Sequence, residues 1–91
     1  MVFHIPGYLR DFTGGRSRVQ LEADSETVEQ ALALLASHHP GVRDRVMTEQ
    51  GEVRPHVNVF VGTESIRFTG GLGTRVSPEA EIWIVPAVSG G

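Results

Sequence analysis

Few residues of this 91-residue chain belong to the types that do covalent chemistry. The sequence has no cysteine, and its eight Lys+Arg residues are all arginines, so it has no lysine either. Without cysteine there is no disulfide, no Cys-ligated zinc or iron–sulfur site and no thiol nucleophile. Without lysine there is no ε-amine to accept an acyl group. Any sulfur that the protein handles must therefore be held by a group other than a side-chain thiol.

The four histidines do not have the spacing of a metal site. His38 and His39 are adjacent, so their side chains diverge by about 100° on a helix, and no carboxylate at ligand spacing adds a third ligand nearby. His38 and His39 are instead expected near the C-terminus of a helix, where the helix dipole favours a protonated imidazole ring. His4 and His56 lie in or beside strand patterns and are expected at the surface. We therefore predict that the chain binds no metal.

The glycine-rich run Gly70-Gly71-Leu72-Gly73 is similar to a phosphate-binding loop in its glycine content alone. It lacks the Gly-Lys-[Ser/Thr] element and does not open a clear helix. We expect a bend that lets Leu72 reach the core, and we predict that this chain binds no nucleotide or other cofactor.

The segment Ala87-Val88-Ser89-Gly90-Gly91 ends in a carboxylate on glycine. Its residues are small, and glycine has no Cβ and a wide φ/ψ range, so we expect residues 87–91 to form a thin, flexible tail. In an arbitrary protein such an end is a frayed terminus. A thin arm is also what would carry a terminal carboxylate into a narrow channel of another protein.

The elements that must hold this tail begin with two strand patterns. Residues 2–5 are β-branched and aromatic and stop at Pro6-Gly7, while residues 18–23 alternate polar and apolar side chains after Gly14-Gly15. The two segments predict an N-terminal β-hairpin. The second strand is expected to face the core with Val19, Leu21 and Ala23.

A helix pattern follows the hairpin. Thr27-Val28-Glu29-Gln30 is a capping box, in which the Thr27 hydroxyl accepts from a backbone N–H and Gln30 reaches back. The apolar stripe of the helix consists of Val28, Ala31, Leu32 and Leu35. Pro40 ends the helix, because proline cannot continue the hydrogen-bond ladder. Val42 and Val46 are spaced for a short extra helical turn.

Strand patterns return in the second half of the chain. They comprise residues 56–61, a short segment around Ile66-Arg67-Phe68, and residues 81–85, which are closed by Pro86. The order predicts an α+β architecture, a β-grasp: a mixed sheet of about five strands packed on one main helix. A ferredoxin-like fold is the alternative, but it needs a second full helix, and residues 74–80 are too short to supply one.

Phe60 and Trp83 alternate away from the apolar faces of their strands, which places two aromatic side chains on the outer surface of the sheet. Either the register differs or a loop covers them, or they form a patch by which a partner docks. Arg67 and Arg75 are candidates for pairing with acidic partner surfaces, although exposed arginines are usually solvated.

The formal net charge of −3 argues against a nucleic-acid partner, whose binding proteins usually carry a basic face. No apolar run approaches the ~18 residues of a membrane span, and the N-terminus lacks the pattern of a signal peptide. We therefore expect a cytoplasmic protein without a nucleic-acid or membrane partner.

Motifs along nearly the whole chain carry a family resemblance. They are Ile5-Pro6, Leu9-Arg10, Thr27-Val28, Arg45-Val46-Met47, residues 57–61, residues 66–72 and residues 82–91, of which Pro-Ala-Val-Ser-Gly-Gly is the most specific. On these residues the chain resembles the MoaD/ThiS family of ubiquitin-like sulfur carriers, most closely its CysO branch. Residues 78–81 depart from the family's Gly-Asp turn, which puts only the geometry of that turn in doubt.

The resemblance implies a ubiquitin-like β-grasp domain over residues 1–86 and a tail over residues 87–91. It implies that the chain is a protein substrate, not an enzyme. Gly91 would be adenylated by an E1-like adenylyltransferase/sulfurtransferase that consumes ATP, and then converted to a thiocarboxylate. Val88, Ser89 and Gly90 would lie in the partner's channel. The sulfur would go to a downstream synthase, with a pyridoxal-phosphate-dependent cysteine synthase favoured.

Other outcomes use the same tail. The sulfur could instead serve molybdopterin, thiazole or a sulfur-containing secondary metabolite. The chain could also be a ubiquitin-like modifier whose Gly91 is joined to lysines of other proteins, or an interaction domain whose tail is inert. Phe60, Trp83 and Arg67 are the candidate partner surface, by which the activating enzyme or the synthase would dock.

Overall fold

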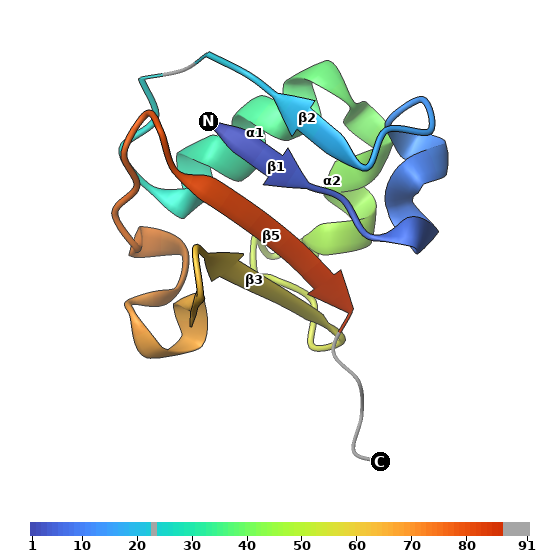
Figure 1. The fold of residues 1–91 in the computed structure, drawn as a ribbon. Coiled ribbons are helices and arrows are strands. Elements are labelled where there is room, and N and C mark those ends of the chain that lie inside the picture. The colour runs from blue at the N-terminus through green and yellow to red at the C-terminus, as the bar shows by residue number, and fades with distance from the viewer. Residues whose placement is uncertain (23, 87–91) are drawn as a thin grey trace.

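Five strands form one mixed sheet in the computed structural model, which describes residues 1–22 and 24–86. The strands are β1 (Val2–His4), β2 (Arg18–Gln20), β3 (Val57–Val61), β4 (Glu64–Ser65) and β5 (Glu81–Pro86). Their order across the sheet is β2-β1-β5-β3-β4. The central pair, β1 and β5, is parallel and comes from opposite ends of the sequence, while the other pairs are antiparallel (Figure 1).

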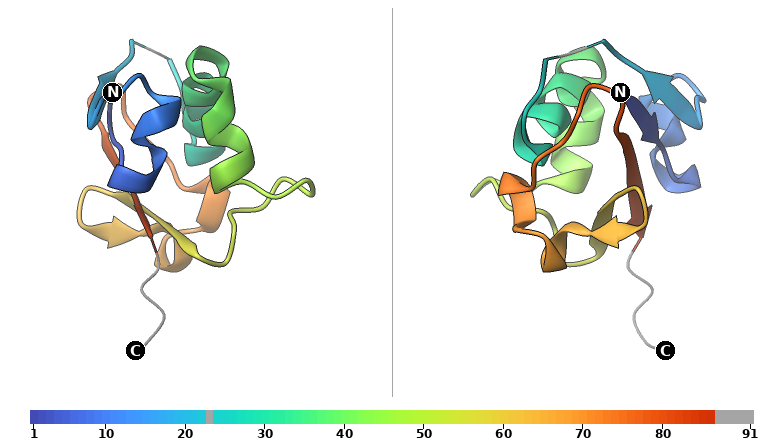
Figure 2. Two further views of the ribbon diagram at one scale, coloured as in Figure 1. Left: turned by 90° about the vertical axis from the view of Figure 1, so that its right-hand side faces the viewer. Right: turned by 60° about the vertical axis from the view of Figure 1, so that its left-hand side comes forward.

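Two consecutive helices, α1 (Val28–His38) and α2 (Pro40–Val46), cover the same face of the sheet (Figure 2). Three short 3₁₀ helices complete the chain: η1 (Gly7–Phe12), η2 (Ile66–Phe68) and η3 (Gly71–Gly73). The prediction of a β-grasp with one main helix is confirmed. The ferredoxin-like alternative fails because α2 follows α1 directly, and the described residues between β4 and β5 form only short 3₁₀ helices and no second full α-helix.

The core lies between the sheet and these helices. Phe3 and Ile82 are completely buried on adjacent strands, and Val59 faces the same interior from β3. The predicted apolar stripe of α1 is buried in full, from Val28 to Leu35. Strand alternation and helix periodicity were sufficient to identify these positions, because each element has one face in the interior.

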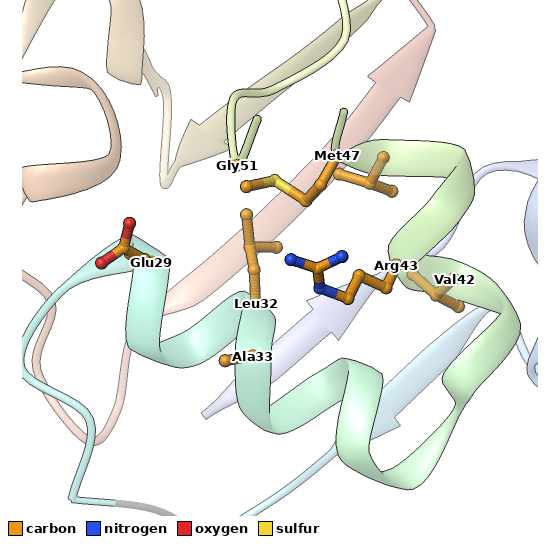
Figure 3. Close-up of a pocket in the computed structure, with 8 residues that line it drawn as sticks. Glu29, Leu32, Ala33, Val42, Arg43, Met47 and Gly51 are labelled. Carbon is orange, nitrogen blue, oxygen red and sulfur yellow. The ribbon is translucent and has the colours of Figure 1, made fainter. Parts of the chain in front are cut away.

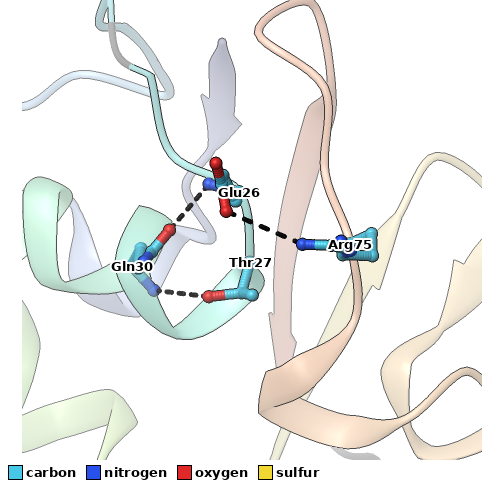
Figure 4. A network of polar contacts seen from close by, with 4 residues as sticks. All are labelled: Glu26, Thr27, Gln30 and Arg75. Carbon is cyan, nitrogen blue, oxygen red and sulfur yellow. Dashed lines mark hydrogen bonds and ion pairs between the residues drawn. The ribbon is translucent and has the colours of Figure 1, made fainter.

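The N-terminus of α1 is capped largely as predicted (Figure 4). Thr27 Oγ1 accepts a hydrogen bond from the backbone N–H of Gln30 at 3.3 Å. The Gln30 side chain accepts from the backbone N–H of Glu26 at 2.7 Å, one residue earlier than a capping box requires. Glu26 also pairs with Arg75 at 3.7 Å, which brings the loop before β5 to the start of α1.

The expectation of a strand around residues 66–68 is wrong. β4 ends at Ser65, whose side chain accepts from the backbone N–H of Arg67 and caps η2. A strand would place Ile66 and Phe68 on one face, but Ile66 is 4% exposed and Phe68 is 88% exposed. The 3₁₀ turn separates them, so that the aliphatic residue enters the core and the aromatic one points to solvent.

The connection between β1 and β2 is longer than a simple turn, because η1 occupies it. The hairpin pairing itself is confirmed, with Val19 buried opposite Phe3. Leu21 is partly buried against the core, and the prediction for Ala23 falls outside the described residues. Residues 77–80 form a turn in which the Ala80 N–H donates to the Ser77 carbonyl, and this turn accommodates Pro78.

Candidate functional site

The predicted reactive end of the chain, with Gly91 and its neighbours Val88, Ser89 and Gly90, lies outside the described residues. The last described residue, Pro86, ends β5 opposite Val57. β5 is the central strand of the sheet and pairs with β1 and β3 along its length. On the inner face of β5, Ile82 is completely buried and Ile84 is almost completely buried. The point from which residues 87–91 continue is therefore fixed by the core.

Trp83 and Phe60 are direct cross-strand partners on the outer face of the sheet, by which we mean the face turned away from α1 and α2. Trp83 is 41% exposed, and Phe60 is partly buried. The two aromatic residues that sequence alternation singled out are thus brought together. Side chains directly opposite in an antiparallel pair are close enough to form one contact surface.

The same register aligns a row of side chains across all five strands. Trp83 pairs with His4 on β1, His4 pairs with Arg18 on β2, and Phe60 pairs with Ser65 on β4. The outer face therefore carries a band that begins with an arginine, has three rings at its centre and ends with a serine. We call it the aromatic row: Arg18, His4, Trp83, Phe60 and Ser65.

Sequence reasoning missed His4, the third ring of this row, as well as Arg18 and Ser65 at its two ends. The His4 ring is stacked on Trp83, and its Nε2 atom lies 2.9 Å from Glu81 Oε1. The prediction of a surface histidine is only partly right, since the side chain is 19% exposed. Strand alternation placed His4 on the face of its strand that Phe3 and Ile5 do not share. Nothing local indicated that β1 would lie beside β5.

Arg67 does not join the aromatic row. It lies in η2, where its Nη2 atom donates to the Pro55 carbonyl at 3.4 Å. Together with Phe60 and the exposed Phe68 it lines a shallow hollow beside β4. Phe68 is a second residue that the sequence did not single out, because its exposure depends on the turn at η2.

Arg75 lies away from this surface, in the pair with Glu26 at the start of α1. Both side chains are largely exposed, so the pair contributes little to stability. Arg75 lies in the loop before β5 and pairs with Thr27, whereas Pro86 ends that strand, so Arg75 is not a neighbour of the candidate site.

A separate groove lies between α1 and α2 (Figure 3). Its lining includes Glu29, Leu32, Arg43 and Met47, and the Arg43 side chain extends from α2 toward Leu32. It is on the helical side of the molecule, away from the aromatic row. No cluster of three His, Asp or Glu side chains that could hold a metal occurs within residues 1–22 and 24–86.

The glycine-rich segment serves the fold. Gly70 and Gly71 have φ values of 115° and 62°, in the left-handed region that favours glycine. Leu72 is packed against the core, as expected. Thr74 closes the turn by donating from its hydroxyl to the Gly71 carbonyl at 2.6 Å. These contacts account for the glycines without a bound phosphate.

The described outer face thus carries aromatic rings and an arginine, which are residue types suited to the recognition of another protein. The match to a family model extends this picture beyond the described residues, since it covers residues 3–91 and the model is that of the ThiS family. The chain belongs to the ThiS family. It is a sulfur carrier protein, and such proteins are not enzymes.

Individual relatives of this ThiS-family chain agree with that assignment. It is 35% identical over 89 residues to the sulfur carrier protein CysO of Mycobacterium tuberculosis, covering 96% of this chain and 94% of the relative. It is 34% identical over 84 residues to small archaeal modifier protein 1 of Haloferax volcanii, covering 91% of each. A chain of the Amycolatopsis orientalis BexX/CysO complex superposes with a TM-score of 0.87 at 37% identity, over 99% of this chain and 98% of that one.

The solved relatives also confirm the ubiquitin-like β-grasp fold of the carrier. Carriers of the ThiS family are activated by E1-like partners. Among the residues that the structure describes, no helix of the carrier is long and apolar enough to cross a membrane.

Proposed function

We propose that Gly91 is the residue on which this carrier holds sulfur. Its carboxylate attacks ATP on an E1-like partner, which forms an acyl-adenylate and releases pyrophosphate. A sulfide nucleophile then displaces AMP and leaves a thiocarboxylate. Adenylation is needed because a carboxylate is a weak electrophile, whereas AMP is a good leaving group. The match of the ThiS family model through residue 91 is the observation that carries this proposal.

The domain boundary follows from the same reasoning. Residues 1–86 act as the β-grasp domain that partners recognise, and residues 87–91 act as the arm that enters their active sites. Val88, Ser89 and Gly90 lie in the partner's channel, where any side chain at position 90 or 91 would clash. The proposal sets the reaction in the cytoplasm, where the ATP that it consumes is available.

The docking surface that we propose consists of Phe60, Trp83 and Arg67. In its favour, Trp83 and Phe60 lie opposite each other on the outer face, on the strand that leads to the tail and on its neighbour. Arg67 contributes from the hollow beside β4. The same surface serves the activating enzyme and the synthase in turn, because one tail occupies one active site at a time.

We favour a cysteine-synthase-like acceptor, in which the thiocarboxylate sulfur is the nucleophile toward an intermediate on pyridoxal phosphate held by the synthase. The similarity to CysO of Mycobacterium tuberculosis supports this choice over molybdopterin, thiazole or secondary-metabolite synthesis. Attack joins the sulfur to the acceptor while it is still bonded to the acyl carbon of Gly91. Hydrolysis of that acyl carbon–sulfur bond leaves the sulfur on the product as a thiol and returns Gly91 to its carboxylate.

Intact-mass spectrometry tests the central step. The carrier is incubated with ATP, an E1-like enzyme and a sulfide donor, and the expected product has one oxygen replaced by sulfur. A variant lacking Gly90 and Gly91 is the matched control and should remain unchanged. If the wild-type chain gains no sulfur under any pairing with E1-like enzymes, Gly91 is not the sulfur-carrying residue.

Protein modification is the second candidate function, since one relative is a small archaeal modifier protein. In that case an activated Gly91 forms an amide with a lysine of another protein. The products distinguish the two functions: a carrier yields a thiocarboxylate of almost unchanged mass, whereas a modifier yields covalently linked species of higher mass.

A further inference from the structure

A cleft on the outer side of the sheet lies directly beside the end of β5. Its lining includes His4, Arg10, Arg18, Trp83, Val85 and Pro86. Pro86 is the last residue before the tail, so the cleft adjoins the point at which the tail begins. The cleft also contains one end of the aromatic row, where Arg18 lies across β1 from Trp83.

The two arginines of this cleft come from different elements. Arg10 lies in η1, and its Nε atom donates to the Ile5 carbonyl at 3.2 Å, which positions the side chain and leaves both Nη atoms for other acceptors. Arg18 lies on the edge strand β2 and is exposed. Ion pairs within the described residues join His4 to Glu81 and Arg75 to Glu26, and neither involves Arg10 or Arg18.

This positive cleft stands out against a negatively charged chain, whose formal net charge is −3. Three of the eleven acidic residues lie around the other end of β5. Glu81 begins that strand, Glu79 lies in the turn before it, and Glu26 is joined through its carbonyl to Val76 in the same loop. β5 therefore has carboxylates near its start and arginines beside its end, and no acidic residue of the described chain lines the cleft, although Asp11 follows Arg10 in η1.

We propose that the cleft at Arg10 and Arg18 binds carboxylate side chains of the activating enzyme at the mouth of the channel that receives the tail. This inference rests on the proposed function and adds the chemistry of the contact. Arginine suits this task, because its guanidinium presents paired donors to a carboxylate. The apolar part of the lining, from Trp83 to Pro86, suits a protein surface better than a free anion.

Gly91, the reacting residue of the proposed function, lies five residues beyond Pro86 in sequence, a span of up to about 18 Å when fully extended. We therefore assign Arg10 and Arg18 to docking at the start of the arm and the chemical step to Gly91 at its end. The cleft thus orients the carrier with its tail toward the partner. Opposite charges on two surfaces mainly raise the rate of association and make it dependent on salt.

Steady-state kinetics of thiocarboxylate formation test this role with an E1-like enzyme that loads the wild-type carrier. Arg10→Gln combined with Arg18→Gln should raise the KM for the carrier about three- to tenfold at low salt and leave kcat unchanged. The difference from wild type should shrink as salt is added. Arg18→Lys, which keeps the positive charge, should have a KM close to that of the wild type.

Arg75→Gln is the matched control, because Arg75 is an exposed arginine that lies in the loop before β5 and pairs with Glu26. The proposal is overturned if the double variant has the KM of the wild type, or if Arg75→Gln raises KM as much. A fall in kcat at unchanged KM would also contradict it. Failure of the wild-type chain to be loaded at all is a different result and counts against the proposed function.

A second measurement does not depend on any enzyme. Titration of the isotopically labelled carrier with an oligoglutamate peptide should shift backbone amide signals around Ile5, Arg18 and Val85. An oligolysine peptide should instead shift signals around Glu26 and Glu81. Uniform shifts, or shifts around Glu26 and Glu81 with oligoglutamate, would show that the cleft is not an acceptor for carboxylates.

Discussion

The imidazole of His4 lies flat on the indole of Trp83, with 3.5 Å between the ring centroids and 8° between the ring planes. The contact joins the first strand of the chain to the last. Because His4 is also hydrogen bonded to Glu81, two residues before Trp83 on the same face of β5, the indole is held on one side by a positioned ring. On its other side Trp83 faces Phe60. Trp83 is thus an exposed aromatic in a fixed orientation, a property typical of residues that dominate binding energies.

Replacement of Trp83 by aspartate tests its role in docking. We expect Trp83→Asp to weaken binding to the activating enzyme by about tenfold or more, the effect of losing a central aromatic contact. The measurement is the dissociation constant, together with the circular dichroism spectrum to establish that the fold persists. Tyr8→Ala is the control, because Tyr8 is 44% exposed, much like Trp83, but lies in η1 and not on the outer face of the sheet. A folded Trp83→Asp variant of wild-type affinity would contradict the proposal.

Gly90 tests the width of the partner's channel. A valine at this position adds a branched side chain to the thinnest part of the arm, so Gly90→Val should lower kcat/KM for thiocarboxylate formation on the order of 100-fold. The stability of the domain should not change. Ser89→Ala, which makes a side chain smaller, should be loaded nearly as well as the wild type. Equal loading of both variants would mean that the channel does not enclose residue 90.

Thr27 tests the contribution of the helix cap to stability. Thr27→Ala removes the oxygen that accepts from the Gln30 N–H, and we expect a loss of about 1 kcal/mol in the free energy of unfolding. Urea denaturation of the variant and the wild type measures this difference in the free energy of unfolding. Arg75→Gln, which removes only the exposed pair with Glu26, should change this free energy by less than about 0.5 kcal/mol. A larger effect at Arg75 than at Thr27 would reverse this ranking.

Gly41 tests the packing of α2 against η1. A Cβ at this position would clash with Cδ1 of Phe12, whose ring also lies 4.6 Å from the guanidinium carbon of Arg45. Gly41→Ala should therefore destabilise the fold by about 1–3 kcal/mol, even though alanine is the better helix former. Gly73→Ala is the control, because its Cβ would meet nothing within 4 Å. An unchanged or higher midpoint of urea unfolding for Gly41→Ala would show that Phe12 moves aside freely.

The sequence by itself determined the elements whose patterns are local. The buried stripe of α1, its capping threonine and the inward faces of β1, β3 and β5 all follow from periodicity, because each pattern records which side of one element is apolar. The glycine-ended tail and its family resemblance also came from the sequence, since they depend on residue type and order. For the same reason, Phe60 and Trp83 could be assigned to an outer face before any pairing of strands was known.

Only the tertiary structure decided which outer residues become neighbours. The aromatic row exists because β1 and β5 pair in parallel, with His4 opposite Trp83, and residues so distant in sequence leave no local signal of their contact. The turn at η2 was likewise decided by the fold, since burying Ile66 required Phe68 to leave the strand pattern. The positive cleft arises in the same way, because Arg10 and Arg18 belong to separate elements. The sheet register places Arg18, and the hydrogen bond from Arg10 to the Ile5 carbonyl holds Arg10, so that both line the cleft beside the residue from which the tail begins.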